Sequence, residues 1–238
     1  MTKKSEQIGF PSLRSVKSDR LLDCDTGRSM NDPGRKILVL ASGNPGKLAE
    51  LTELLAPLGF NLRPQSDWQV PEAIEDASTF LENALIKARN AARVCALPVV
   101  ADDSGLVVPA LDGAPGIQSA RYAGMDATDK ANNRKLLQAM DGFRVADRVA
   151  FFHCVMVLMR SATDPAPLVA GARWWGEIGS SETGSGGFGY DPLFWLPDMN
   201  CTSAELPPEE KNRLSHRGRA ARRLVELLRA EHESYGWE

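Results

Sequence analysis

The stretch Val99-Val-Ala-Asp-Asp-Ser-Gly-Leu-Val-Val-Pro-Ala-Leu-Asp-Gly-Ala-Pro-Gly-Ile-Gln-Ser-Ala-Arg-Tyr-Ala-Gly124 combines apolar runs with closely spaced carboxylates. Its first run, Val99 to Ala101, is typical of a buried strand, and a second β-like run extends from Leu106 to Leu111. The tetrapeptide between the two runs, residues 102–105, reads Asp-Asp-Ser-Gly and suits a tight turn. The same tetrapeptide also suits a polar site at the end of a strand, and the pattern alone leaves both interpretations open.

The adjacent carboxylates Asp102 and Asp103 are the first candidates for chemistry. A carboxylate at the end of a buried strand is costly unless it is solvated, paired or bound to a cation. Neighbouring strand residues point to opposite faces, so we expect only one of the two aspartates to face a given cleft.

Length, composition and charge limit the class of protein. The chain has 238 residues, of which 43% are hydrophobic and 25% charged, the usual mix of a globular protein with one sizeable core. The net charge of -3 provides no basic field, so we expect neither nucleic acid nor a membrane as partner. The four cysteines form no Cys-x-x-Cys pair, which favours a reducing compartment and a cytoplasmic location.

The N-terminal segment, residues 1–35, is polar, mixed in charge and without apolar periodicity. It contains no apolar core of a secretory signal, and we expect a disordered N-terminal tail. Met30 precedes the first apolar run, so a start at that residue would yield a compact domain, and residues 1–29 are expected to be dispensable. The remaining residues, 36–238, form one predicted folded domain.

Periodicity predicts strands and helices in alternation along this domain. The expected strands are Lys36–Ala41, Asn61–Pro64, Val99–Ala101, Arg148–Arg160 and Leu168–Ile178. The expected helices follow Lys47, run from Thr79 to about Leu97 and from Asp126 to Met140, and begin again after Ser215. The last two long strands, joined by a short Pro-containing turn, indicate a hairpin. We therefore predict an α/β fold with a mixed β-sheet flanked by helices.

A polar loop joins the first predicted strand to the first helix. Its residues are Ser42, Gly43, Asn44, Pro45, Gly46 and Lys47. Backbone N–H groups converge on phosphate in such loops. The loop is not a Walker P-loop, because that motif needs Gly at the position of Ala41 and Ser or Thr at the position of Leu48. A plain strand-to-helix turn remains the alternative.

A glycine-rich segment, Gly184 to Gly189, satisfies Gly-x-Gly-x-x-Gly, but no helix is expected after it, which excludes a dinucleotide-binding fold. Glycine lets a backbone approach a ligand closely, and Phe188 and Tyr190 offer aromatic faces for stacking. Further along, a dense basic cluster holds Lys211, His216, Arg217, Arg219, Arg222 and Arg223. A solvated helix face explains Arg222 and Arg223.

Several of these motifs resemble the inosine triphosphate pyrophosphatase family. The matching segments are Ala101–Leu106, Gly113–Gly116, Ser119–Gly124, the Ser-x-Asn-x-x-Lys-x-x-Glu pattern of residues 42–50, and Gly186–Pro192. The resemblance extends from about residue 36 to about residue 228. It implies two lobes with a substrate cleft between them, a homodimer, and hydrolysis of the noncanonical purine nucleotides ITP, dITP and XTP to the monophosphate and pyrophosphate.

The resemblance also implies roles for single residues. Asp103 would act as catalytic base and, together with Glu82, bind Mg²⁺. Glu82 has a structural alternative, because Thr79-x-x-Glu82 has the form of a helix capping box. The implied substrate-binding residues are the six residues 42–47, Ser104, Phe188, Gly189, Tyr190, Asp191, Lys211, His216 and Arg217.

Two other functions fit the same residues. One is a regulator that binds a purine nucleotide without hydrolysing it, and the other is a related pyrophosphatase for other modified bases. The carboxylate of Asp103 favours an enzyme over the regulator, because a passive anion site gains nothing from additional negative charge.

Overall fold

A central strand, β3 (Val99–Val107), lies between parallel strands on one side and antiparallel strands on the other in the computed structural model, which describes residues 36–235. The predicted N-terminal tail lies outside the described residues. The other strands are β1 (Lys36–Leu40), β2 (Phe60–Pro64), β4 (Val149–Met159), β5 (Leu168–Ile178), β6 (Phe194–Leu196) and β7 (Cys201–Thr202). The α-helices are α1 (Pro45–Leu55), α2 (Phe80–Cys95), α3 (Asp129–Ala139), α4 (Pro208–Leu214) and α5 (His216–Tyr235).

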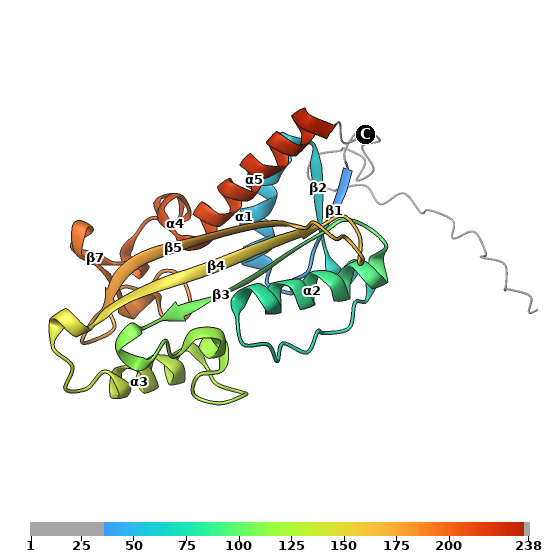
Figure 1. Cartoon of the computed structure of the whole chain (residues 1–238). Helices are drawn as coiled ribbons and strands as arrows, with labels where there is room; N and C mark the ends of the chain where they lie inside the picture. Colours follow the sequence, from blue (N-terminus) through green and yellow to red (C-terminus); the bar gives the residue numbers. More distant parts are fainter. Residues whose placement is uncertain (1–35, 236–238) are drawn as a thin grey trace, which may run out of the picture. The chain divides into compact units, whose positions relative to one another are not determined.

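The described strands form one mixed sheet in the order β2-β1-β3-β4-β5-β6-β7. β1 pairs in parallel with β2 and β3, whereas every pair from β3 to β7 is antiparallel. The long hairpin of β4 and β5 is the one predicted from the sequence. The mixed α/β class is therefore confirmed (Figure 1).

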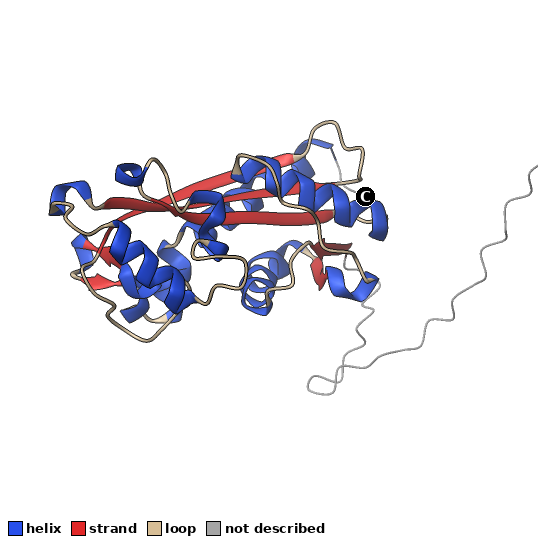
Figure 2. Cartoon of the chain, turned by 90° about the horizontal axis from the view of Figure 1, so that it is seen from below, coloured by secondary structure: helices blue, strands red, loops and turns tan. Residues whose placement is uncertain are grey.

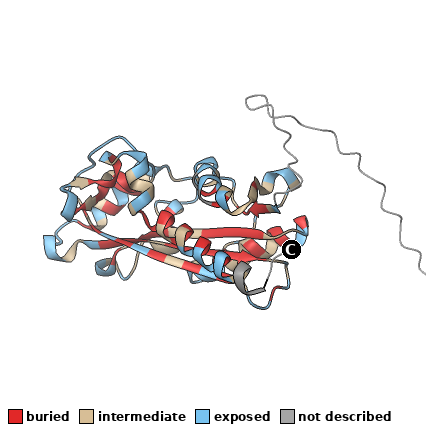
Figure 3. Cartoon of the chain, turned by 90° about the horizontal axis from the view of Figure 1, so that it is seen from above, coloured by how far each residue is buried: buried red, intermediate tan, exposed pale blue. Residues whose placement is uncertain are grey.

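Helices cover both faces of the sheet (Figure 2). Because side chains alternate along β3, successive residues pack against helices on opposite faces. Val99 and Ala101 pack in one apolar cluster with small residues of α2 such as Ala88. Val100 packs in a second cluster with Leu51 of α1, and residues of α5 complete that cluster. Buried residues accordingly concentrate on the strands and on the inward sides of the helices (Figure 3).

Strand β3 continues through the Asp-Asp-Ser-Gly tetrapeptide, so the turn considered at residues 102–105 is wrong. Asp102 pairs with Met156 of β4 and Asp103 pairs with Val155, in an unbroken antiparallel register. Turn propensity is overridden here because the ladder satisfies the backbone and nearby cations satisfy the carboxylates. Gly105 is needed in the strand, because a Cβ there would lie 2.5 Å from the Gly116 carbonyl oxygen.

Beyond the end of β1, the edge of β3 has no strand among the described residues paired with it. Strand β1 pairs with β3 only through Val39 and Leu40, and the Ala41 N–H makes one further bond to the Val100 carbonyl. Beyond this point the chain leaves the sheet through the loop of residues 42–47. The segment of β3 that carries the aspartates therefore has a neighbouring strand on one side only.

Polar residues cap the starts of three helices. Asn44 caps α1, Thr128 caps α3, and the Ser215 hydroxyl accepts a hydrogen bond from the Gly218 N–H in the first turn of α5. Between residues 36 and 235, none of the helices has the length and apolar character required to cross a bilayer.

Candidate active site

Asp102 forms a buried ion cluster on the α1 and α5 side of β3. Its carboxylate lies 2.8 Å from the Lys47 ammonium and 3.7 Å from the Arg217 guanidinium, and the residue is 1% exposed. Burial alone would raise the pKa of this carboxyl, but the positive charges of Lys47 and Arg217 hold the pKa well below its usual range. Asp102 is therefore a permanent anion that links two helices to the sheet.

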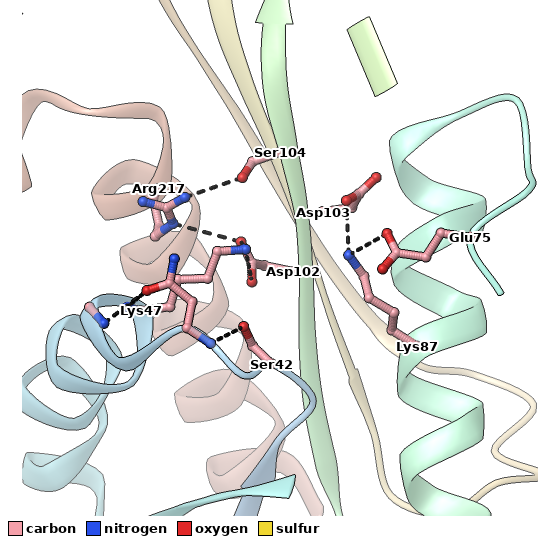
Figure 4. A network of polar contacts seen from close by, with 10 residues as sticks. Ser42, Lys47, Glu75, Lys87, Asp102, Asp103, Ser104 and Arg217 are labelled. Carbon is pink, nitrogen blue, oxygen red and sulfur yellow. Dashed lines mark hydrogen bonds and ion pairs between the residues drawn. The ribbon is translucent and has the colours of Figure 1, made fainter. Parts of the chain in front are cut away.

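Asp103 points to the opposite face, toward α2. Its carboxylate accepts a hydrogen bond of 2.9 Å from the Lys87 ammonium, which also lies 3.0 Å from the Glu75 carboxylate. Burial raises the pKa of Asp103, although Lys87 opposes the shift. Figure 4 shows the two aspartates with their separate partners on either side of the β3 ribbon.

Both aspartates are among the residues that line one cavity of about 330 Å³. Their side chains differ as the strand alternation predicts, because the Asp102 side chain is wholly buried in its ion cluster whereas that of Asp103 is 13% exposed. This acidic cavity, as we call it, is also lined by Ser42, Gly43, Lys47, Glu72, Glu75, Lys87, Ser104 and Arg121.

Within the loop of residues 42–47, three backbone N–H groups are already hydrogen-bonded to side chains of the loop, so they are not free to bind a ligand. The Asn44 side chain already accepts hydrogen bonds from the N–H groups of Gly46 and Lys47. The Asn44 N–H in turn donates to the Ser42 hydroxyl. Pro45 and Gly46 lie in the first turn of α1 and line neither cavity described here.

A second cavity, of about 280 Å³, adjoins the first. The two share Lys47, Ser104 and Ala120 as lining residues. This aromatic cavity, as we call it, also contains Asn44, Ser119, Asp129, Asn132, Phe152, Phe188, Gly189, Tyr190, Asp191, Lys211, His216 and Arg217. One elongated ligand could therefore place an anionic end and an aromatic end in the two cavities at the same time.

Asp191 fixes the shape of the glycine-rich loop. Its carboxylate accepts hydrogen bonds from the Phe188 N–H at 2.8 Å, the Lys211 ammonium at 2.5 Å and the Ser203 hydroxyl at 2.8 Å. A Cβ at Gly187 would lie 2.1 Å from the same carboxylate, so only glycine fits there. Lys211, one of the expected substrate-binding residues, lines the aromatic cavity and not the acidic one.

The two aromatic residues of this loop have different environments. Phe188 is 52% exposed, and the Lys211 nitrogen lies 5.0 Å from the centre of its ring. Tyr190 is only 4% exposed, and its hydroxyl donates to the Ser119 carbonyl oxygen. Phe188 is thus half exposed, with Arg217 as a second cation 5.5 Å from its ring centre, whereas the Tyr190 hydroxyl fastens the loop to the neighbouring segment.

His216 and Arg217 begin α5 and face the aromatic cavity. The His216 ring stacks on Phe152 at 4.8 Å, and its Nδ1 has no hydrogen-bond partner among the described residues. Burial, together with the charge of Arg217, lowers the pKa of His216 well below its usual value, so the ring is neutral. The Arg217 guanidinium donates to the Ser104 hydroxyl at 3.2 Å.

Glu82 occupies the capping position considered for it. The Thr79 hydroxyl accepts from the Glu82 N–H and donates to its carboxylate at 2.8 Å, and Glu82 is exposed outside both cavities. Glu75 instead supplies the second carboxylate beside Asp103. Among the described residues no group of three or more metal-binding side chains occurs, so any cation here would rest on these two carboxylates and its ligand.

No motif in the sequence points to Glu75, Lys87 or Asp129 as residues of the site, or to Asp102 as a member of an ion cluster. Lys87 carried a detectable signal, because it is a charged residue on the mostly apolar inner side of a predicted helix. Glu75 lies in an irregular segment before α2, where no periodic pattern indicates orientation.

The fold and the site define a class. The open edge of a mixed sheet carries two carboxylates, which meet one lysine from α1 and one from α2 next to a cavity with an exposed aromatic ring. This arrangement is that of an α/β protein with a ligand site for a charged, partly aromatic small molecule. The comparisons with known proteins agree, since the model described as "Ham1 family" matches residues 38–227. The chain belongs to the Ham1 family, which confirms the resemblance found in the sequence.

The relatives are similar over nearly their whole length. The dITP/XTP pyrophosphatase of Vibrio cholerae is 54% identical over 193 residues, covering 81% of this chain and 96% of the relative. The dITP/XTP pyrophosphatase of Methylococcus capsulatus is 55% identical over 196 residues, covering 82% and 98%. A solved HAM1 protein from Coxiella burnetii matches with a TM-score of 0.79 and 49% identity, over 82% of this chain and 99% of that one.

The ion cluster around Asp102 leads to a prediction about stability. Replacing Asp102 by Asn should lower the free energy of unfolding by about 3 kcal/mol, because removing one member of a buried ion pair leaves the other charges uncompensated. Urea denaturation at pH 7 measures the loss.

Asp103→Asn is the matched control, since it removes the neighbouring carboxylate while Glu75 stays beside Lys87. We expect this variant to lose less than about 1 kcal/mol, as for an ordinary polar substitution. Equal losses in the two variants would show that the ion cluster is not the source of the stability.

Proposed function

We propose that this protein hydrolyses ITP, dITP and XTP to the nucleoside monophosphate and pyrophosphate. The observation that carries the proposal is the position of Asp103, a carboxylate of raised pKa in a cavity that adjoins an aromatic cavity. The relatives named dITP/XTP pyrophosphatase support the substrate class. We place the enzyme in the cytoplasm, where a reducing environment suits its four separated cysteines.

The two cavities suggest how the substrate lies. The purine would stack on Phe188 and reach His216 and Arg217, and the triphosphate would extend past the shared residues Lys47 and Ser104 toward Asp103. Lys47 and Lys87 both line the acidic cavity on this path, and each is paired there with one or more carboxylates. The sugar and the α-phosphate would then lie at the junction of the two cavities.

The two carboxylates on Lys87 indicate where a metal would bind. Asp103 and Glu75 both contact one ammonium group, so the protein already holds a cation between them. Mg²⁺ is the metal we propose, because it binds one or two carboxylates and completes its shell with water and phosphate oxygens. When bound, it would neutralise charge on the phosphates during transfer. Glu82, the ligand implied by the family resemblance, stays the alternative to Glu75.

Asp103 would act as the general base. Its carboxylate takes a proton from the attacking water, whose oxygen forms a bond to the α-phosphorus while the bond to the bridging oxygen of pyrophosphate breaks. Burial raises the pKa of Asp103, which makes its carboxylate a stronger base than an ordinary aspartate. In the structure, the same carboxylate accepts a hydrogen bond from Lys87.

The reaction itself is the first test. Incubation of the full chain with ITP and Mg²⁺ should yield IMP and pyrophosphate in equal amounts, resolved by anion-exchange chromatography. IDP and orthophosphate as first products would refute the proposal. Tight binding of ITP without turnover would instead identify the non-hydrolysing regulator.

Asp103→Asn supplies the matched variant for this assay. It keeps the shape of the side chain but removes its basicity, so kcat should fall by about a hundredfold or more. The circular dichroism spectrum should stay that of the wild type. Turnover close to normal in this variant would assign the base to another residue.

Selectivity for the base follows from hydrogen-bond donors. Hypoxanthine and xanthine carry an acceptor oxygen at position 6, where adenine carries an amino donor. Arg217 only donates, and neutral His216 donates from one ring nitrogen. A donor facing adenine's amino group would leave a polar group unpaired, which costs about 1–3 kcal/mol or roughly ten- to a hundredfold in kcat/KM.

Replacement of Arg217 by Ala should therefore reduce the ITP-to-ATP ratio of kcat/KM by about tenfold or more. Arg217→Lys serves as the control for the ion cluster, because it retains a positive charge beside Asp102. Steady-state assays with both nucleotides give the ratio. A parallel fall of both activities at constant ratio would mean that Arg217 binds phosphate rather than base.

The outer face of β5 supports the homodimer implied by the family resemblance. Arg173, Trp175 and Glu177 alternate along this face, and Trp175 is 52% exposed with its ring 4.5 Å from that of Phe151. The pattern is self-complementary, with a cation and an anion at equal spacing from an exposed aromatic ring. A two-fold axis at Trp175 would place Arg173 of one copy opposite Glu177 of the other.

Charge reversal tests this surface. Light scattering after gel filtration should give twice the mass of one chain for the wild type. Glu177→Arg should give a monomer because like charges then face each other, and the double swap Arg173→Glu with Glu177→Arg should restore the dimer. A dimeric Glu177→Arg variant would assign the interface to a different face.

A further inference from the structure

A carboxylate outside the proposed catalytic groups holds the glycine-rich loop from the other side of the aromatic cavity. Asp129, the first residue of α3, accepts a hydrogen bond of 2.7 Å from the Gly189 N–H, 60 residues further along the chain. Both residues line the aromatic cavity next to Phe188. No motif in the sequence connects Asp129 with this loop.

The segment that carries Asp129 is itself well anchored. Asn132, one turn further along α3, is 2% exposed, accepts a hydrogen bond from the Ala123 N–H and donates one to the Ala120 carbonyl. The Thr128 side chain caps the helix. Asp129 therefore extends from a fixed position toward the loop.

The loop depends on contacts of this kind. Residues 181–188 are exposed, and the backbone adopts positive φ at both Gly187 and Gly189. A glycine backbone samples many conformations when nothing holds it. Two carboxylates accept hydrogen bonds from successive N–H groups of the loop. Asp191 accepts from the Phe188 N–H, and Asp129 accepts from the Gly189 N–H.

We propose that Asp129 is a positioning residue for purine recognition, whose carboxylate holds the loop so that the Phe188 ring covers the base. A hydrogen bond to an ionised acceptor is stronger than a neutral one, which suits this purpose. The proposal rests on the function proposed above. The acidic cavity, where the chemistry would occur, is lined by neither Asp129 nor Phe188.

Asp129→Ala should consequently change substrate binding and spare the chemical step. Stacking on an aromatic ring contributes to ground state and transition state alike, so KM for ITP should rise about tenfold while kcat stays within about threefold. Asp129→Asn should recover most of this loss, because an amide oxygen still accepts from Gly189. Asp126→Ala, an exposed carboxylate in the same segment outside the cavity, should behave as the wild type.

Two measurements separate positioning from a merely structural effect. Tripolyphosphate has no base, so its inhibition constant should be equal in the wild type and in Asp129→Ala. In a double-mutant cycle, Asp129→Ala should add little to Phe188→Ala, because both remove the same stacking contact. Additive losses, or a matching loss of tripolyphosphate inhibition, would overturn the proposal.

Amide hydrogen exchange gives a readout that is independent of activity. The loop of residues 184–190 should exchange faster in Asp129→Ala than in Asp126→Ala, with the strands unchanged. Unchanged exchange in this loop would overturn the positioning role even if ITP is hydrolysed. Failure of the wild type to hydrolyse ITP, with faster exchange still seen in Asp129→Ala, would refute the proposed function and leave the loop contact standing.

Discussion

The buried carboxylate of Asp102 is the interaction on which the arrangement of the site depends. It binds Lys47 at the start of α1 and Arg217 at the start of α5, so both helices are fixed to β3 at one point. A buried anion with two cations around it tolerates little displacement, because each charge lost from the cluster leaves another unpaired in a medium of low polarity. The loop of residues 42–47 and the first turn of α5 therefore keep their places on the open edge of β3.

The pKa of the next residue in the strand, Asp103, is shifted in the opposite direction. The pKa of Asp102 is lowered by its cations, whereas burial raises the pKa of Asp103. Two neighbouring carboxylates whose environments shift their pKa values apart are suited to different tasks, one structural and one reactive. The alternation of a β-strand is sufficient to separate them, and the early end of β1 leaves the edge of β3 beside them without a strand partner among the described residues.

Much of this architecture could be predicted from the sequence, because apolar periodicity and capping residues are local signals. The hairpin of β4 and β5 and the cap at Ser215 are examples. The continuation of β3 through residues 102–105 was not predictable, since pairing with a distant strand overrides turn propensity. The same holds for Glu75 and for the different exposures of Phe188 and Tyr190, which follow from long-range contacts that leave no pattern in the chain.

The ion cluster also links the two ends of the cleft. Lys47 lines both cavities, and Arg217, which faces the aromatic cavity, is oriented by the same carboxylate and by Ser104. Because His216 beside it is neutral, Arg217 is the charged residue of this pair, and its guanidinium shares the Asp102 carboxylate with Lys47. One buried anion therefore positions both the cation that lines the two cavities and the cation at the aromatic end.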